Sequence, residues 1–152
     1  MSEELASFRI KGMNKLENKL QKVVKSLDDR KKVHGQAVVI GDKWIQDNFT
    51  KQGALAYPGT GWKQLSPTTI MMRRKGPKST LFPKILIDTG TMRSRWKHLW
   101  SARQAAIQSG VDYSVKHHTG KDVPERRILP SEEQIMPKLK ALFLTWIKGI
   151  IS

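Results

Sequence analysis

The residues with the most suggestive chemistry are Asp88-Thr89-Gly90, which follow an apolar run in "ILIDTGTMRS". The same tripeptide carries the catalytic aspartate of aspartic proteases. Such an enzyme needs two carboxylates that share one proton, because two like charges at close range cannot both ionise. A chain of 152 residues must dimerise to supply the second carboxylate. Arg93 and Arg95 would also hold Asp88 ionised, so a dimeric aspartic protease is only a distant alternative.

A local backbone role explains the same tripeptide more simply. The apolar run predicts a short strand that ends at Asp88, whose carboxylate would accept hydrogen bonds from backbone amides two or three residues further on. Thr89 could do the same more weakly. Gly90 permits a backbone conformation that a side chain would forbid. This interpretation predicts a turn, followed by one turn of helix over "TMRS".

Metal, cofactor and nucleophile chemistry has little support in the sequence. His117 and His118 are adjacent, so their side chains point in different directions and do not form a chelating pair. His34 and His98 are remote, and there is no cysteine to complete a site. No nucleophile elbow or phosphate-binding loop is present. We therefore predict a protein without cofactor or metal that is not an enzyme.

The charge predicts a polyanionic partner. The chain has 28 Lys and Arg against 13 Asp and Glu, a net charge of +15. Ten of the basic residues lie within 62–103, with Asp88 as the single acid of that segment. Nucleic acid and an acidic protein surface are both candidates, and a solvated basic loop is the plainer alternative. The positions expected to contact DNA or an acidic partner are Arg73, Arg74, Lys75, Lys78 and Lys84.

Composition limits the class of protein. The length suits one domain with one core. No apolar run approaches the roughly 20 residues that a membrane span needs. The stretch "MSEELASFRI" does not resemble a signal peptide. With no cysteine to form disulfides, we expect a soluble protein made in the cytoplasm, with no membrane partner.

The hydrophobic spacing predicts an α+β fold within a single domain, 1–152. Apolar residues recur every three or four positions over 3–28 and 30–51, which predicts two helices in an N-terminal hairpin (1–52). Turn residues dominate a loop-rich basic segment (53–84), in which Ser66 could cap a short helix. We expect the remaining elements to be strands at 84–88, 94–100 and 104–109 in a β-rich part (85–130), and a C-terminal helix (131–152) capped by Ser131 and Gln134.

Three segments carry a resemblance when taken together and in order: "GWKQLSPTT" (61–69), "KILIDTGTMRSRW" (84–96) and "VDYSVKHHTGKDVPERRIL" (111–129). They resemble the virion morphogenesis, or tail completion, proteins of tailed bacteriophages, over roughly residues 44–145. Met92, Ser114 and Arg127 stand where that family usually has Leu, Ala and Pro. The matching motif positions are Trp62, Leu65, Ser66, Thr69, Leu86, Asp88, Thr89, Gly90, Tyr113, His117, Gly120, Pro124 and Arg126.

The resemblance implies a structural role without enzymatic activity. Proteins of this family act at the head–tail junction, or neck, of the virion, where they finish the tail or join it to a DNA-filled head. The chain would then be assembled in the host cytoplasm as an oligomeric ring, with a hexamer favoured, against other connector and tail proteins. DNA in the channel would be touched non-specifically. A stand-alone, non-specific nucleic-acid-binding protein remains the main alternative.

Overall fold

The computed structural model of the chain describes residues 13–28, 30–75 and 83–151. Within these residues it has six helices and one antiparallel pair of strands. The predicted α+β class, with N-terminal helices and a C-terminal helix, is confirmed. In chain order the elements are α1 (Met13–Asp28), α2 (Lys31–Thr50), α3 (Pro67–Lys75), α4 (Thr91–Ser94), β1 (Trp96–Trp100), β2 (Ala105–Ser109), α5 (Tyr113–Thr119) and α6 (Glu132–Ile151).

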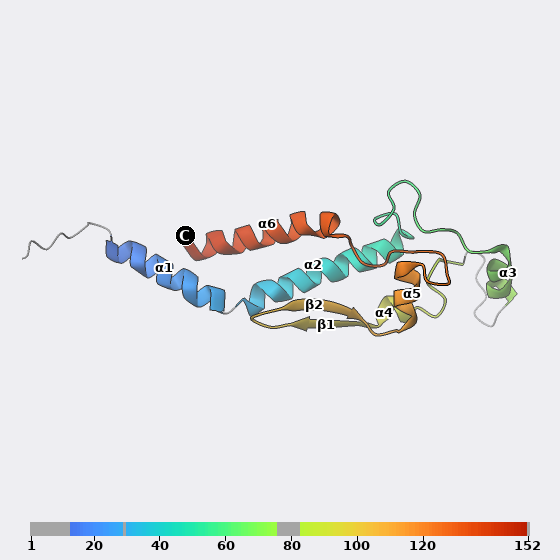
Figure 1. The fold of residues 1–152 in the computed structure, drawn as a ribbon, viewed down its shortest axis with the longest axis horizontal. Helices are drawn as coiled ribbons and strands as arrows, with labels where there is room; N and C mark the ends of the chain where they lie inside the picture. Colours follow the sequence, from blue (N-terminus) through green and yellow to red (C-terminus); the bar gives the residue numbers. More distant parts are fainter. Residues whose placement is uncertain (1–12, 29, 76–82, 152) are drawn as a thin grey trace, which may run out of the picture.

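Helix α2 lies at the centre of an elongated molecule (Figure 1). The last helix, α6, runs along one side of α2, and the β1–β2 hairpin runs along the other. Because α2 is covered from two directions, it buries residues on more than one face. Val33, Ile45 and Phe49 are fully buried, and Trp44 is nearly so. Hydrophobic burial of these side chains is the main force that holds the three layers together.

The two N-terminal helices lie end to end, whereas the sequence predicted a side-by-side hairpin (Figure 1). Their antiparallel neighbour is α6, which returns along both α1 and α2. Since α6 offers an apolar face to each of them, α1 does not need to fold back on α2. The result is a long molecule with α1 at one end.

Helix α1 buries none of its side chains within residues 14–28. Its apolar residues are the stripe that predicted the helix. Four of them are about half exposed: Leu16 at 54%, Leu20 at 56%, Val24 at 58% and Leu27 at 42%. Among the described residues, most of this apolar face therefore has no packing partner.

The predicted hairpin of strands is confirmed. β1 and β2 pair antiparallel, with Trp96 opposite Ser109 and Trp100 opposite Ala105. The strand predicted at 84–88 is wrong. Leu86 adopts a left-handed backbone conformation, with φ of 57°, which an extended strand cannot contain. The segment is a turn whose apolar residue Ile85 is buried in the core, so the apolar run reflects packing rather than strand pairing.

The main core gathers at the far end of α2 from α1. Its buried members are Trp44, Ile45, Phe49, Trp62, Ile85, Met92, Val111 and Ile128. Asn48 is fully buried beside them and ties two loops to α2. Its amide nitrogen donates to the carbonyl of Arg127 at 3.0 Å, and its amide oxygen accepts from the backbone of Ala56 at 3.3 Å. These contacts fix the loops that build the site described below.

Helix α6 begins with half of the predicted capping box. The backbone amide of Ser131 donates to Oε1 of Gln134 at 3.1 Å. Pro137 lies inside the helix and does not end it. Among the helices of the described residues, none combines the length and apolar character needed to cross a membrane.

Candidate functional site

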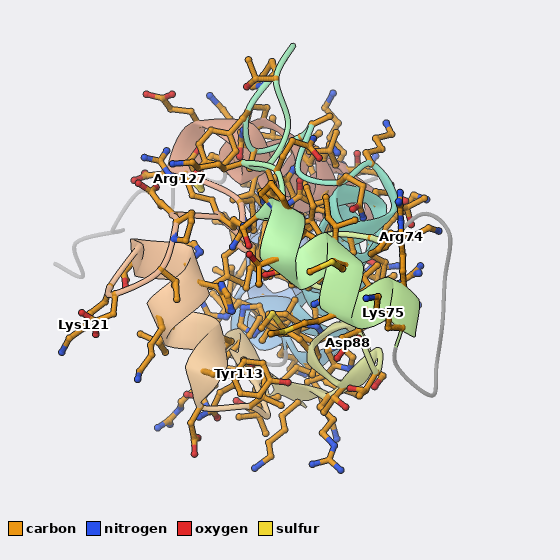
Figure 2. The ribbon with its side chains drawn as sticks, turned by 90° about the vertical axis from the view of Figure 1, so that its right-hand side faces the viewer. Arg74, Lys75, Asp88, Tyr113, Lys121 and Arg127 are labelled. Carbon is orange, nitrogen blue, oxygen red and sulfur yellow. The ribbon has the colours of Figure 1, made fainter. Side chains whose placement is uncertain are left out.

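A cleft of about 640 Å³ opens at the end of the molecule opposite α1. Figure 2 looks onto this end, with α3 in front, α5 on one side and the segment that carries Asp88 on the other. The three motif segments, which are distant in sequence, meet here. Eleven of the thirteen motif residues line the cleft: Leu65, Ser66, Thr69, Leu86, Asp88, Thr89, Gly90, Tyr113, His117, Pro124 and Arg126.

The two remaining motif residues support the cleft from behind. Trp62 is 1% exposed and packs edge-on against Phe49, with ring centroids 5.3 Å apart. Its indole nitrogen donates to the carbonyl of Arg127 at 2.9 Å. Gly120 ends α5 in the left-handed conformation, with φ of 76°, that glycine adopts without strain. Both residues are structural, and neither reaches the cleft.

Helix α3 forms one wall, and its start follows the prediction. The hydroxyl of Ser66 accepts a hydrogen bond from the amide of Thr69 at 3.2 Å, as an N-cap residue does. The two hydroxyls are 2.9 Å apart. One turn further on, Arg73 also lines the cleft. Its guanidinium donates to the carbonyl of Lys84 at 2.8 Å and thereby holds the opposite wall.

The tripeptide Asp88-Thr89-Gly90 forms a turn at the rim, and its cap differs from the predicted one. No side-chain bond from Asp88 caps α4. The hydroxyl of Thr89 instead accepts from the amide of Thr91 at 3.3 Å. Gly90 is left-handed, with φ of 79°, as expected. Asp88 points to Arg73, with 3.6 Å between its Oδ1 and the guanidinium Nε, and this side chain is 62% exposed. The ion pair with Arg73 therefore takes the place of the predicted cap.

Arg126 is the most unusual group in the cleft. It is only 6% exposed. Its Nε donates to the carbonyl of Lys63 at 3.1 Å. Within the part of the chain that the structure describes, no carboxylate forms an ion pair with it. Burial lowers the pKa of Arg126, and the nearby charge of Arg73 lowers it further. The cleft lining therefore contains three cationic residues, Lys63, Arg73 and Arg126, and one carboxylate, that of Asp88.

The two histidines of α5 differ in their surroundings. His117 lines the cleft, and burial and the charge of Arg126 lower its pKa. Its Nδ1 is buried and has no hydrogen-bond partner among the described residues. His118 faces away from the cleft, and its Nδ1 accepts from the amide of Ile128 at 3.1 Å. His118 is thus held neutral for a structural reason.

The four described basic positions that were expected to contact DNA or an acidic partner differ in their surroundings. Arg73 lines the cleft, whereas Arg74 and Lys75 are exposed on the outer part of α3 (Figure 2). Lys84 is exposed on the turn, and Lys78 lies outside the described residues. Contact with DNA or an acidic partner stays a prediction for this set.

The chemistry of the cleft suits an anionic group that carries apolar surface. Arg73 and Arg126 supply positive charge, while Leu65, Leu86 and Val123 supply apolar walls. The described residues contain no group of three or more His, Asp or Glu side chains that could hold a metal ion. The motif pattern did not indicate Lys63 or Val123, and nothing in the sequence marks Arg126 as buried.

Comparison with known proteins adds no relative. No family model matches the chain, and neither a curated protein nor a solved structure does.

Proposed function

We propose that this chain is a structural subunit of the bacteriophage tail completion or neck type. It would assemble as an oligomeric ring at the head–tail junction of the virion and connect the tail to the DNA-filled head. It would work through contacts with copies of itself and with other connector and tail proteins, without catalysis.

The observation that carries the proposal is the uncovered apolar face of α1. Four half-exposed aliphatic residues lie along a helix that buries none of its side chains within residues 14–28. A contiguous apolar face of this kind on a soluble subunit marks a protein–protein contact. Such a face suits a chain that assembles with copies of itself or with other proteins.

The cleft supports the same proposal. The three segments that resemble the tail completion proteins, at 61–69, 84–96 and 111–129, contribute residues to one cleft although other stretches of sequence separate them. Residues brought together in this way are suited to bind a partner. Among the described residues, no hydrogen bond joins His117 to a hydroxyl group of the cleft lining.

The test is assembly. Electron microscopy of the purified protein, alone and with purified heads or tails, should show rings or occupied head–tail junctions. The triple variant Leu16→Gln, Leu20→Gln, Val24→Gln should keep its helical content and lose assembly. Lys15→Gln, Lys19→Gln, Lys22→Gln on the same helix is the matched control and should still assemble. A strict monomer that never joins heads or tails would refute the proposal.

A second candidate is a stand-alone, non-specific nucleic-acid-binding protein, which the exposed Arg74 and Lys75 on α3 favour. Phosphate contacts by such residues give affinity without sequence preference. This second function requires no assembly. A protein that stays monomeric and binds DNA would therefore favour it over the first.

A further inference from the structure

We propose that the cleft receives the acidic segment Glu3-Glu4-Leu5 of a second copy of this chain, with a glutamate carboxylate pairing with Arg126. The inference rests on the proposed assembly function and names one contact between its subunits. The segment precedes the described residues and enters the argument through its sequence alone.

The lining of the cleft fits a carboxylate. A guanidinium is planar and binds a carboxylate through two parallel hydrogen bonds. Arg126 is more than nine-tenths buried and uses its Nε within the chain. A buried charge without an oppositely charged partner is costly, and a carboxylate arriving in the cleft relieves that cost. Arg73 stands beside it and adds attraction for the same anion.

The apolar part of the lining favours a peptide over the backbone of DNA. Leu65, Leu86, Val123 and Pro124 need apolar partners, which a phosphate–sugar chain cannot offer. Asp88 at the rim repels any anion, and it repels a run of phosphates more than the single carboxylate of a glutamate. A glutamate next to a leucine supplies one anion and one apolar group at neighbouring positions, as the cleft requires.

Charge complementarity points to the segment at Glu3. The chain has few acids, and several in the described part already face a cation: Asp42 with His98, Asp47 with Lys43, Asp88 with Arg73 and Glu125 with Arg127. Glu3 and Glu4 are adjacent to Leu5, with Phe8 three residues further on. That combination matches both the charge and the apolar surface of the cleft.

Chain length excludes binding within one molecule. Glu4 lies nine residues before Met13, so it reaches at most about 32 Å from the start of α1, at 3.6 Å for each residue. The 16 residues of α1 and the 20 of α2 extend about 24 Å and 30 Å, and the two helices lie end to end between that point and the cleft (Figure 1). The segment can therefore enter only the cleft of another copy.

Such a contact joins different surfaces of two identical subunits. A head-to-tail contact of this kind closes into a ring when its rotation divides a full turn, and otherwise makes a filament. The cleft at one end and the acidic segment at the other would thus supply one repeated contact of the ring, beside the contact made by the apolar face of α1.

Two measurements on the full-length chain test the inference. Sedimentation equilibrium should show that Glu3→Gln, Glu4→Gln lowers the self-association constant about tenfold to a hundredfold, as expected for losing a charged hydrogen bond. The control Glu132→Gln, Glu133→Gln neutralises two exposed acids in the first turn of α6 and should leave the constant unchanged. Neither pair of substitutions alters the cleft.

The second measurement uses a labelled peptide of residues 1–10 and, as receptor, the Glu3→Gln, Glu4→Gln protein. Fluorescence anisotropy should show binding, which the same peptide with glutamines at positions 3 and 4 should lose. Arg126→Lys in the receptor should weaken binding at least tenfold. If that variant does not fold, Arg73→Gln should still weaken binding.

The outcomes separate the inference from the proposed function. Rings whose association constant is unaffected by Glu3→Gln, Glu4→Gln would overturn the inference and leave the tail completion proposal standing. A peptide that fails to bind would also overturn it, whatever the oligomeric state. Displacement of the peptide by a DNA duplex that itself needs Arg126 would assign the cleft to phosphate instead.

Discussion

Single residues in the cleft show how one fold gives two arginines different properties. Arg73 faces the exposed carboxylate of Asp88 and the carbonyl of Lys84, so its charge is partly compensated and partly in water. Arg126 is buried, and among the described residues it donates a hydrogen bond to the carbonyl oxygen of Lys63 and forms no ion pair. The difference makes Arg126 the group whose energy changes most when an anion enters.

The role of Asp88 is testable by a single substitution. Asp88→Asn removes an exposed ion pair at 3.6 Å, and such pairs contribute at most about 1 kcal/mol. We expect urea denaturation to show a loss of stability within that range, with the fold unchanged. No peptide cleavage should be seen in either protein. Pepstatin-sensitive cleavage that disappears with the substitution would restore the protease alternative.

The neutral state of His118 predicts that acid destabilises the protein. Burial lowers the pKa of His118 below its usual 6.5, and the charge of Arg127 adds to this effect, although Glu125 opposes it. As the pH falls below about 7, the unfolded chain binds protons that the folded chain does not, so the free energy of unfolding decreases. His117 shifts in the same direction and contributes to the same loss.

The variant His118→Asn isolates the contribution of this histidine. An asparagine oxygen can still accept from the amide of Ile128, but it does not titrate. We expect the free energy of unfolding of the variant, measured by urea denaturation, to decrease less between pH 7 and pH 5 than that of the wild type. Some decrease should remain, because His117 still titrates. An unchanged slope would show that His118 is not held neutral by the fold.

At the scale of the elements, the sequence predicted the helices and strands whose apolar residues recur with a regular spacing. Apolar spacing located α2, α6 and the strand pair within a few residues and the end of α1 at Asp28, whereas the expected helix start at residue 3 lies outside the described residues. It failed at 84–88, where an apolar run of strand length instead packs Ile85 through a turn. It also could not show that α1 and α2 lie end to end, since their spacing is the same in either arrangement.

The candidate site was also predictable only in part, because sequence patterns do not show which distant segments meet in the fold. The motif residues could be grouped by resemblance, but their convergence depends on tertiary contacts such as those of Asn48 and Trp62. Of the two side chains expected to accept from backbone amides, Thr89 does so from the amide of Thr91, whereas Asp88 pairs with Arg73. Burial of Arg126 follows from its surroundings and has no signature in the sequence.

Asn48 ties helix α2 to two loops, and its removal should be costly. Asn48→Ala leaves the carbonyl of Arg127 and the amide of Ala56 with one partner fewer and opens a small cavity. We expect a loss of about 2–4 kcal/mol in the free energy of unfolding. Asn18→Ala on the exposed surface of α1 is the control and should change stability by less than about 0.5 kcal/mol. Equal effects of the two substitutions would contradict this role.

At the scale of the whole molecule, the subunit is long and its two ends differ. One end exposes the apolar stripe of α1, and the other opens the charged cleft. A shape of this kind gives two distinct contact surfaces far apart on one chain. It is suited to a repeating assembly and poorly suited to a compact twofold dimer.

The positive charge of the molecule gives a prediction about DNA. Replacing Arg73, Arg74, Lys75 and Lys78 with glutamine should lower any affinity for duplex DNA and reduce the dependence of that affinity on salt concentration. Each lost phosphate contact reduces the salt slope by roughly one. Titration with a labelled duplex at several salt concentrations measures both quantities. An affinity that stays the same would assign these residues to a protein contact or to solubility.

Because Arg126 is buried without a paired carboxylate among the described residues, the melting temperature of the protein should depend on the concentration of an anion that binds the cleft. Any anion that binds the folded cleft, but not the unfolded chain, raises the melting temperature by mass action. Differential scanning calorimetry should therefore show the wild-type chain melting later as its own concentration rises. The Glu3→Gln, Glu4→Gln variant should show a weaker dependence. The subunit would then be least heat-resistant when dilute and would become more resistant as it is built into a particle.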